Sequence, residues 1–493
     1  MVDMEGWEGG IVELGVSEVL MKQFRIILVL ALVLGMAGMA ASDLGQTIEQ
    51  AFSNPGFAHG IQGIIVESLK DGRVLYEKNS NLVFMPASNM KLIVSSASLD
   101  LLGKDYVIPT SLYLTGEVSD GTLKGDVILA GQGDPTLKDE NLEEMAAKLK
   151  SMGIKRIEGN IIADDTYFDS VRLGSGWSWD YQSDYYAAQI SAINLNQNVV
   201  GVYVRPGKKV GKPAVIELLP QTRYMKIENE CKTSETGATK GIFMNRIMGT
   251  NTIRIGGNVA LDYKPTGPED GVTVDDPALF ACTVFSEILK RDGIRLRGKV
   301  LHGTAPTDAK PMFVHNSPPM SQILKLLNKP SDNLIAECLL KQLGARLNGK
   351  GSADSGGKVE MGYLEKIGAD TTGINISDGS GLSRYNVVSP GNLLAVLKYM
   401  HGHKDSQVFF ESLPIAGVDG TLKGRLKDTA AEGNVHAKTG YIGMVRALSG
   451  YVTTKSGESL VFSILMNNHL CPRSEADAAI DTIVIALANI TTN

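Results

Sequence analysis

The stretch from about residue 105 to residue 310 differs in pattern from both ends of the chain, and this difference constrains the fold most. Short alternating runs dominate it, and turns rich in Gly, Asp and Lys separate them. Side chains in a strand point alternately to its two faces, so alternation indicates strands with one buried face. The runs are SLYLTGEV, GDVILAG, RIEGNIIAD, NVVGVYVRPG, PAVIELLP and NTIRIGGNVAL. We therefore expect a mostly β region of one or two domains.

The N-terminal part mixes strands with a helix. Residues 60–79 form two apolar, β-branched runs around Asp71 and Gly72, and Asp-Gly is a strong hairpin turn signal. The next segment has apolar residues at helical spacing between Pro86 and Gly103. A β-hairpin followed by a helix is therefore expected.

The C-terminal part has the same mixture. From about residue 312 two helices are expected on either side of Pro330, and a further helix begins at Pro390. The runs NVHAKTG, MVRALSGYVTT and SLVFSILMNN then predict three successive strands, and residues 474–490 predict a final amphipathic helix. Both ends of the chain therefore predict antiparallel strands covered by helices.

The 493 residues are too many for a single core, and 43% hydrophobic residues supply ample material for several. The economical arrangement is an α/β (α+β) fold in which residues 42–105 and 312–493 form one domain with an antiparallel sheet covered by helices. Residues 106–168 and 268–311 then form an inserted β-rich domain, and residues 169–267 a further domain nested within it.

The N-terminal segment 21–41 has the pattern of a secretory signal peptide. Lys22 and Arg25 precede an apolar run, and small residues follow. A membrane-spanning helix is the alternative, but the apolar run is shorter than the roughly 20 residues a span needs. We expect an exported protein of the periplasm or extracytoplasmic cell envelope, with at most peripheral membrane association. Residues 1–20 are interpreted as a mis-assigned leader before a true start at Met21.

Charge and cysteine usage exclude some classes of partner and site. The net charge of −6 is spread without long runs, so no basic stripe for nucleic acid is present. The four cysteines have no C-x-x-C spacing and His is scarce, so a zinc site is not expected. We expect no cofactor. An exported chain could form a disulfide, and buried free thiols are the alternative.

Ser88 and Lys91 are the first candidates for chemistry. They are three residues apart at a predicted helix start, so their side chains share one face. A serine hydroxyl is a poor nucleophile until a base takes its proton, and a lysine can be that base only if burial or a second cation lowers its pKa. Taken by itself, this pair is more often a capping serine and a solvated lysine.

Two later triplets change that balance. Ser331, Asp332 and Asn333 follow a helix break, where a hydroxyl and a carboxamide can both face a cleft, although an ordinary N-cap would use the same residue types. The second triplet, Lys-Thr-Gly at 438–440, ends a predicted strand, and its glycine permits close approach of a ligand backbone. A strand end with a turn glycine is the alternative.

Ser-x-x-Lys, Ser-x-Asn and Lys-Thr-Gly in this order form the set found in class A β-lactamases and penicillin-binding proteins. With blocks such as GQGDPTL, SDNLIAECLLKQLG, DGSGLSRYNVVSP and PIAGVDGTLKGRL, the chain resembles the D-alanyl-D-alanine carboxypeptidase/endopeptidase family from about residue 55 to its end. These enzymes are the low-molecular-mass class C penicillin-binding proteins, with a β-lactamase/transpeptidase-like domain. Ser88 and Ser331 are 243 residues apart, which favours this family over compact β-lactamases.

The resemblance implies a serine DD-peptidase that acts on peptidoglycan stem peptides ending in D-Ala-D-Ala and on cross-links, and that β-lactams acylate. Ser88 would attack the carbonyl of the penultimate D-alanine while Lys91 accepts its proton. Backbone N–H groups of Ser88 and Tyr441 would form the oxyanion hole. Ser331 would relay a proton to the leaving amine.

The remaining motif residues would bind substrate. The resemblance implies that Asn333 holds the amide of the acyl side, and that Lys438 and Thr439, followed by Gly440, bind the terminal carboxylate. Lys438 would also help to lower the pKa of Lys91. Tyr441 departs from the family pattern, which has a small Thr or Ser there, so its side chain would narrow the cleft.

Other polar and aromatic residues are expected to have structural roles. Asp332 would cap a helix, Glu337 would be a structural partner, and Asp378 and Ser380 would shape the rim of the cleft. The aromatic segment 174–196 is interpreted as packing rather than a binding surface. It includes Gln189, where the family usually has proline.

Two alternatives to the DD-peptidase remain. A β-lactamase or serine esterase could use the same motifs and differ in rapid hydrolysis of the acyl-enzyme, which sequence does not reveal. A non-catalytic peptidoglycan-binding protein could retain the pocket, although it would have no need of all six polar motif side chains.

Overall fold

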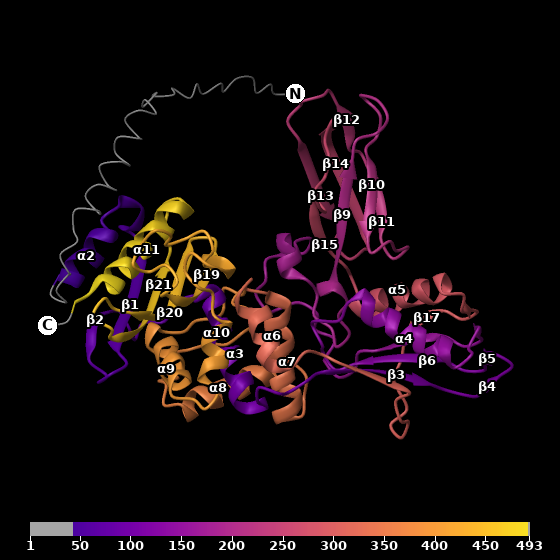
Figure 1. Ribbon diagram of the computed structural model, residues 1–493, viewed down its shortest axis with the longest axis horizontal. Helices are drawn as coiled ribbons and strands as arrows, with labels where there is room; N and C mark the ends of the chain where they lie inside the picture. The colour runs from indigo at the N-terminus through magenta and orange to yellow at the C-terminus, as the bar shows by residue number, and fades with distance from the viewer. Residues whose placement is uncertain (1–42, 492–493) are drawn as a thin grey trace, which may run out of the picture.

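The protein has two lobes, and its computed structural model describes residues 43–491 (Figure 1). One lobe contains both ends of the described chain, and the other contains the middle of the chain with a β-rich arm that projects from it (Figure 1). The expected leader and signal segment, residues 1–41, lie outside the described residues. No helix within residues 43–491 has both the length and the apolar character needed to cross a bilayer.

The first lobe is built on an antiparallel five-stranded sheet in the order β19-β20-β21-β1-β2. Its strands are β1 (Ile61–Ser68), β2 (Val74–Lys78), β19 (His436–Ile442), β20 (Val445–Thr453) and β21 (Ser459–Asn467). Strands β1 and β21 pair along their whole lengths, so the two ends of the chain meet in one sheet. The predicted hairpin and the three predicted C-terminal strands are confirmed.

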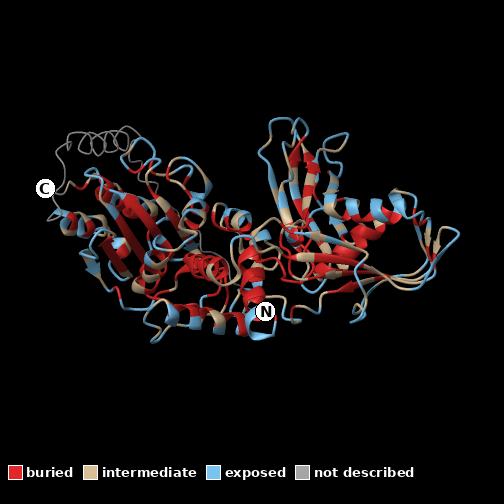
Figure 2. Cartoon of the chain, turned by 60° about the horizontal axis from the view of Figure 1, so that its bottom comes forward, coloured by how far each residue is buried: buried red, intermediate tan, exposed pale blue. Residues whose placement is uncertain are grey.

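Helices cover both faces of this sheet, and its strands β20 and β21 are among the most completely buried elements (Figure 2). Alternation along β1 places Ile64 and Val66 against one helical layer and Ile65 against the other. One layer consists of α2 (Leu44–Ala51) and α11 (Arg473–Asn489). The other consists of α3 (Met90–Leu102), α6 (Met320–Asn328), α7 (Asn333–Asn348), α8 (Ala353–Lys366), α9 (Pro390–His401) and α10 (Ser406–Ser412).

Apart from the arm, the second lobe has two sheets and two α-helices. The larger sheet has the order β17-β8-β6-β3-β18, and the smaller has the order β16-β7-β5-β4. The elements are β3 (Pro109–Leu114), β4 (Val118–Ser119), β5 (Thr122–Leu123), β6 (Val127–Gly131), α4 (Asp139–Ser151), β7 (Arg156–Ile157), β8 (Ile161–Asp164), α5 (Pro277–Arg291), β16 (Arg295–Leu296), β17 (Val300–His302) and β18 (Phe313–Asn316). Helices α4 and α5 contribute buried residues to the same core as these strands.

The projecting arm is formed by the chain between β8 and α5 (Figure 1). One of its sheets has the order β10-β9-β15, and in the other β14 pairs with β11, β12 and β13. The strands are β9 (Val199–Arg205), β10 (Val215–Leu219), β11 (Lys226–Asn229), β12 (Lys232–Ser234), β13 (Gly241–Arg246), β14 (Thr252–Ala260) and β15 (Asp270–Thr273).

The structure differs from the sequence-based expectation in three respects. The middle of the chain is less exclusively β than predicted, because α4 and α5 lie within it. Strand β18 lies beyond the boundary expected at residue 312, yet it pairs with β3 of the second lobe. Strand β15 lies beyond the boundary expected at residue 268, yet it pairs with β9 of the arm. Strand pairing therefore places β18 with the second lobe and β15 with the arm.

Candidate active site

Ser88 lies in a 3₁₀ turn, η3 (Ala87–Asn89), immediately before α3. The residue before it, Ala87, has a φ of +47°, in the left-handed region that non-glycine residues rarely adopt. Such a conformation persists only when surrounding structure enforces it, and it is typical of functional sites. The backbone at Gly381 packs so closely against this turn that an added Cβ would lie 1.7 Å from Ala87 O. This contact helps to hold the turn in its conformation.

Lys91 is fully buried and is hydrogen-bonded through every N–H of its ammonium group. Its Nζ donates to Ser88 Oγ over 2.9 Å, to Asn333 Oδ1 over 2.7 Å and to the Ser380 carbonyl over 2.6 Å. Burial lowers the pKa of Lys91 from its ordinary 10.5 to about 8, against the attraction of nearby carboxylates led by Asp378. Neutral lysine is therefore accessible near physiological pH, as a general base requires.

Ser331 and Asn333 lie at the break between α6 and α7, as their positions after Pro330 predict. Ser331 has a φ of +67°, a second left-handed residue at the site. The Asn333 carboxamide bridges the cleft, since its Oδ1 accepts from Lys91 and its Nδ2 donates to the Tyr186 carbonyl over 2.7 Å. Asp332 is the N-cap of α7 and accepts from Ile335 N over 2.9 Å, which confirms its capping role.

The Lys-Thr-Gly triplet lies on β19, the edge strand of the sheet, where backbone groups that do not pair with β20 face the cleft. Lys438 Nζ donates to Ser331 Oγ over 2.8 Å and to the Thr439 carbonyl over 3.1 Å. Thr439 Oγ1 lies 2.7 Å from Thr421 Oγ1. A Cβ on Gly440 would lie 2.7 Å from Pro86 O, so only glycine lets the strand approach the Ser88 turn this closely.

Burial, and then repulsion from Lys91, lower the pKa of Lys438 well below its ordinary value. Burial is the main cause of the lowered pKa of Lys91. Repulsion between the two ammonium groups is mutual, so it disfavours the charged form of either lysine while the other is charged.

These motifs converge on one cleft of about 560 Å³ that separates the sheet edge from the second lobe's aromatic segment. Ser88, Ser331, Asn333, Thr439 and Gly440 line it. Sequence reasoning did not assign a further set of residues that also line it: Tyr181, Tyr185, Tyr186, Thr421, Arg425, Arg446, Arg473 and Asp477. Tyr181 and Tyr186 pack against a hydrophobic cluster, as the packing interpretation expects, and together with Tyr185 they also line the cleft.

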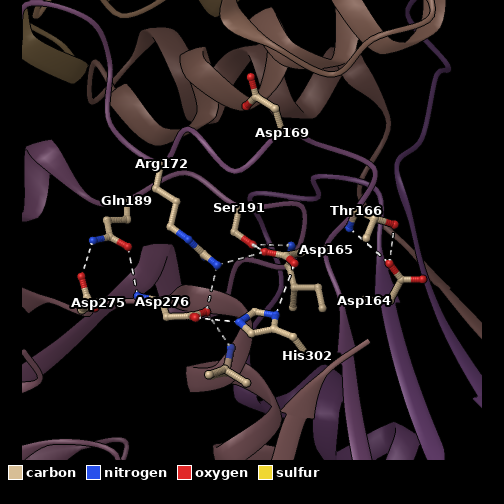
Figure 3. Close-up of polar contacts among 12 residues, drawn as sticks. Asp164, Asp165, Thr166, Asp169, Arg172, Gln189, Ser191, Asp275, Asp276 and His302 are labelled. Atoms are coloured by element: carbon tan, nitrogen blue, oxygen red, sulfur yellow. Dashed lines mark hydrogen bonds and ion pairs between the residues drawn. The ribbon is translucent and has the colours of Figure 1, made fainter. Parts of the chain in front are cut away.

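We call residues 173–188 the aromatic loop. The residues that flank it, Arg172 and Gln189, belong to the polar cluster in Figure 3. Ile190 N donates to the Arg172 carbonyl over 2.8 Å and closes the loop at its base. Arg172 Nη2 lies 3.4 Å from Asp165 and 3.2 Å from Asp276, and His302 lies between the same two carboxylates (Figure 3). The cluster therefore fixes the cleft wall relative to the second lobe.

Gln189 completes this anchor at the other end of the loop. Its Nε2 donates to Asp275 Oδ1 over 2.6 Å, and its Oε1 accepts from Asp276 N over 3.0 Å (Figure 3). It is buried and does not line the cleft. The residue that departs from the family pattern in this segment is thus structural, as expected.

Buried carboxylates lie beneath Lys91 rather than at the mouth of the cleft. Glu337 accepts from the N–H groups of Gly379 and Ser380, and burial followed by repulsion from Asp378 raises its pKa to about 8. Asp378 accepts from Gly381 N and from Trp177 Nε1. Asp378 and Ser380 have no exposed surface, so the expectation that they form the cleft rim was wrong.

Within residues 43–491 no group of three or more His, Cys, Asp or Glu side chains is arranged to hold a metal ion. All four cysteines are buried and free, so the alternative of free thiols is the one observed. The site described here is built from serine, lysine, asparagine and threonine side chains and has the elements of acyl transfer.

Comparison with known proteins agrees with this geometry. Residues 44–490 match the family described as "D-Ala-D-Ala carboxypeptidase 3 (S13) family". A D-alanyl-D-alanine carboxypeptidase from Actinomadura sp. is 36% identical over 92% of this chain and 86% of its own. A D-alanyl-D-alanine carboxypeptidase from Haemophilus influenzae is 29% identical over 88% of this chain and 89% of its own.

The fold matches solved structures as well. The crystal structure of penicillin binding protein 4 from Haemophilus influenzae superposes with a TM-score of 0.78 at 28% identity, over 92% of this chain and 98% of that one. This match confirms the β-lactamase/transpeptidase-like domain with its long insert. With the three motifs assembled around one buried lysine and the family match over nearly the whole chain, the protein is a serine DD-peptidase that belongs to the D-Ala-D-Ala carboxypeptidase 3 (S13) family.

Proposed function

We propose that the protein cleaves D-Ala-linked bonds in peptidoglycan stem peptides and in their cross-links through an acyl-enzyme on Ser88. The observation that carries this proposal is the 2.9 Å contact between Lys91 Nζ and Ser88 Oγ, together with the lowered pKa of that lysine. Neutral Lys91 keeps its N–H bonds to Asn333 and Ser380 and accepts the hydroxyl proton of Ser88 with its lone pair.

Acylation forms a bond between Ser88 Oγ and the carbonyl carbon of the penultimate D-alanine. Lys91 takes the serine proton, and the backbone N–H groups of Ser88 and Tyr441 bind the oxyanion. As the C–N bond breaks, Ser331 gives its proton to the leaving amine and takes one from Lys438, which lies 2.8 Å away. The two lysines together hold the same number of protons after this step as before it.

The other motif residues bind substrate. Lys438 and Thr439 bind the carboxylate next to the scissile bond, and Gly440 lets the substrate backbone lie along the edge strand. Asn333 holds the amide on the acyl side. Water then attacks the acyl-enzyme, Lys438 regains its proton through Ser331, and Lys91 returns one to Ser88.

β-Lactams acylate the same serine and keep their leaving group tethered in the cleft, so hydrolysis of that acyl-enzyme is slow. A second structure of the Haemophilus influenzae protein, complexed with a β-lactam, supports this proposal, with a TM-score of 0.73 at 26% identity over 91% of this chain and 98% of that one. Peptidoglycan as substrate and the signal-like segment 21–41 support action outside the cytoplasm, in the periplasm or cell envelope.

The experiment that tests the proposal measures release of free D-alanine from a synthetic stem pentapeptide by wild type, Ser88→Ala and Ser95→Ala. Ser95 is buried on α3, the helix that follows Ser88, and it hydrogen-bonds to the Lys91 carbonyl, so its substitution tests for general damage to this helix. We expect release by wild type and Ser95→Ala and none by Ser88→Ala. D-Alanine released by Ser88→Ala at the wild-type rate would overturn the assignment.

A further inference from the structure

We propose that Arg446, Tyr441 and Arg473 form an anion-binding subsite on the leaving-group side of the scissile bond. Its ligand class is a peptide carboxylate beyond the one that Thr439 holds. The subsite makes cross-linked stem peptides better substrates than peptides that release a single D-alanine. This inference rests on the proposed function and specifies its substrate class.

The position of the subsite follows from strand geometry. Thr439 and Tyr441 are two residues apart on β19, so their side chains lie on the same face of the strand. Tyr441 pairs directly with Arg446 across the β19–β20 ladder. A leaving group whose carboxylate is bound by Thr439 therefore has the Tyr441 side chain as its next neighbour along the strand.

The ring of Tyr441 stacks on two guanidinium groups. Its centroid lies 4.1 Å from Arg446 Cζ and 4.9 Å from Arg473 Cζ, and the residue is 52% exposed at the cleft. Guanidinium groups stack well on aromatic faces and keep their N–H edges free to bind carboxylates. A small Thr or Ser at this position would not supply such a platform.

The charged side chains around Tyr441 include more cations than anions. A single carboxylate, Asp477, is shared by Arg425 at 3.1 Å, Arg446 at 3.1 Å and Arg473 at 3.6 Å. Asp481 pairs with Arg425, so three guanidinium groups face two carboxylates.

Arg446 supplies a second observation. It is 3% exposed and lines the cleft, yet its buried Nε has no hydrogen-bond partner. A buried charged donor without a hydrogen-bond partner is costly. Because Arg446 lines the cleft, an anionic ligand there would stabilise its guanidinium group through charge, without reaching Nε itself. Arg473 is its exposed counterpart, with 67% of its side chain accessible.

Leaving-group chemistry then selects the substrate class. Release of one D-alanine places a single carboxylate in this half of the cleft, and Lys438 and Thr439 hold it. Cleavage of a cross-link releases an entire stem peptide, which carries further carboxylates. Only that leaving group can use the second set of guanidinium groups.

The test compares kcat/KM for a cross-linked stem-peptide dimer with kcat/KM for a monomeric pentapeptide. The variants are Arg473→Gln, Arg473→Lys and the control Arg223→Gln, since Arg223 is equally exposed at 69% and pairs with Glu287 in the second lobe. We expect the dimer-to-monomer ratio to fall roughly three- to tenfold in Arg473→Gln, the range for one charge-assisted contact in an accessible cleft. The ratio should be only partly retained in Arg473→Lys, which keeps the charge but loses the planar group that stacks on Tyr441, and it should be unchanged in Arg223→Gln. An unchanged ratio in Arg473→Gln would overturn the proposal.

A salt titration of wild type tests the same point without substitution. Raising ionic strength screens exposed charges, so the dimer-to-monomer ratio should fall between about 0.05 M and 0.5 M salt. A ratio that stays constant contradicts the subsite. Labelling of Ser88 by a fluorescent penicillin in the same preparations separates the two levels of the argument. If wild type neither reacts with the penicillin nor cleaves peptide, the proposed function itself is wrong. If wild type is labelled but the dimer-to-monomer ratio of kcat/KM does not change in Arg473→Gln, only the subsite is wrong.

Discussion

The lowered pKa of Lys91 predicts the pH dependence of acylation. If neutral Lys91 removes the Ser88 proton, the second-order rate constant for acylation by a penicillin must follow the fraction of neutral lysine. Burial lowers this pKa from 10.5 to about 8, which means that the protein destabilises the charged form relative to the neutral form by about 3 kcal/mol. The rate should therefore rise with pH and stop rising above that value. Lys438, whose pKa is also lowered, supplies the proton for the leaving amine through Ser331, so its deprotonation would only reduce the rate at higher pH.

The magnitude follows from the titration curve. With a pKa of about 8, the neutral fraction grows from about 1% at pH 6 to about 90% at pH 9, and then by only about a tenth up to pH 10. With the ordinary 10.5, it would be about 3% at pH 9 and would still rise about eightfold up to pH 10. The interval from pH 9 to pH 10 distinguishes the two cases.

The assay is stopped-flow or quenched acylation by a fluorescent penicillin at constant ionic strength between pH 6 and pH 10. Glu337 also has a pKa of about 8, so Glu337→Gln serves as the control. Because Glu337 raises the pKa of Lys91 by attraction, its removal should leave an inflection at or below the wild-type position. A rate that keeps rising steeply above pH 9, or an inflection that disappears in Glu337→Gln, would refute the reasoning.

Two further predictions concern the geometry that holds the cleft. In Gly440→Ala the new Cβ would lie 2.7 Å from Pro86 O, so penicillin acylation should slow by more than about tenfold, whereas Gly424→Ala, whose Cβ meets nothing within 4 Å, should react normally. Arg172→Met removes the cation between two carboxylates at the base of the aromatic loop. Thermal unfolding should show that the free energy of unfolding falls by about 1–3 kcal/mol, and kinetic assays should show a higher KM for stem peptides. Loss of the exposed pair in Arg205→Met should change stability by less than about 0.5 kcal/mol, and equal effects of the two arginine variants would contradict the anchoring role.

Much of the first lobe could be predicted because its local signals are strong. The hairpin around Asp71 and Gly72, the helix break at Pro330 and the final three strands all carry turn residues or alternation that leave few alternatives. The sequence of helix α4 also has helical periodicity, with Leu142 and Leu149 on one apolar face, but the expectation of a mostly β region does not include this helix.

Helix α8 is different, because its sequence argues against a helix. It contains Gly356 and Gly357, and each glycine costs about 1 kcal/mol in a helix interior. The structure supplies the reason for Gly356, since a Cβ there would lie 2.0 Å from the Leu340 carbonyl of α7. Close packing of two helices overrides local propensity, and no local pattern reveals it.

The motif residues that meet in the cleft, and whose catalytic and binding roles we propose, could be placed together because they lie in short motifs, whereas the walls of the cleft could not be predicted. Arg446 is found only once the register of β19 and β20 is known, and Arg473 only once α11 is placed beside them. The tyrosines of the aromatic loop look like packing residues in sequence. Their place in the cleft depends on an anchor formed by Arg172 and residues far away along the chain.

The most direct test of the account is to identify the residue that penicillin acylates. Wild type, Lys91→Ala and Ser88→Ala would be incubated with penicillin, digested and analysed by mass spectrometry for a peptide carrying the drug. The account predicts a stable adduct on Ser88 in wild type and none in either variant. An adduct on another residue, or an adduct on Ser88 that forms equally fast without Lys91, would contradict the mechanism.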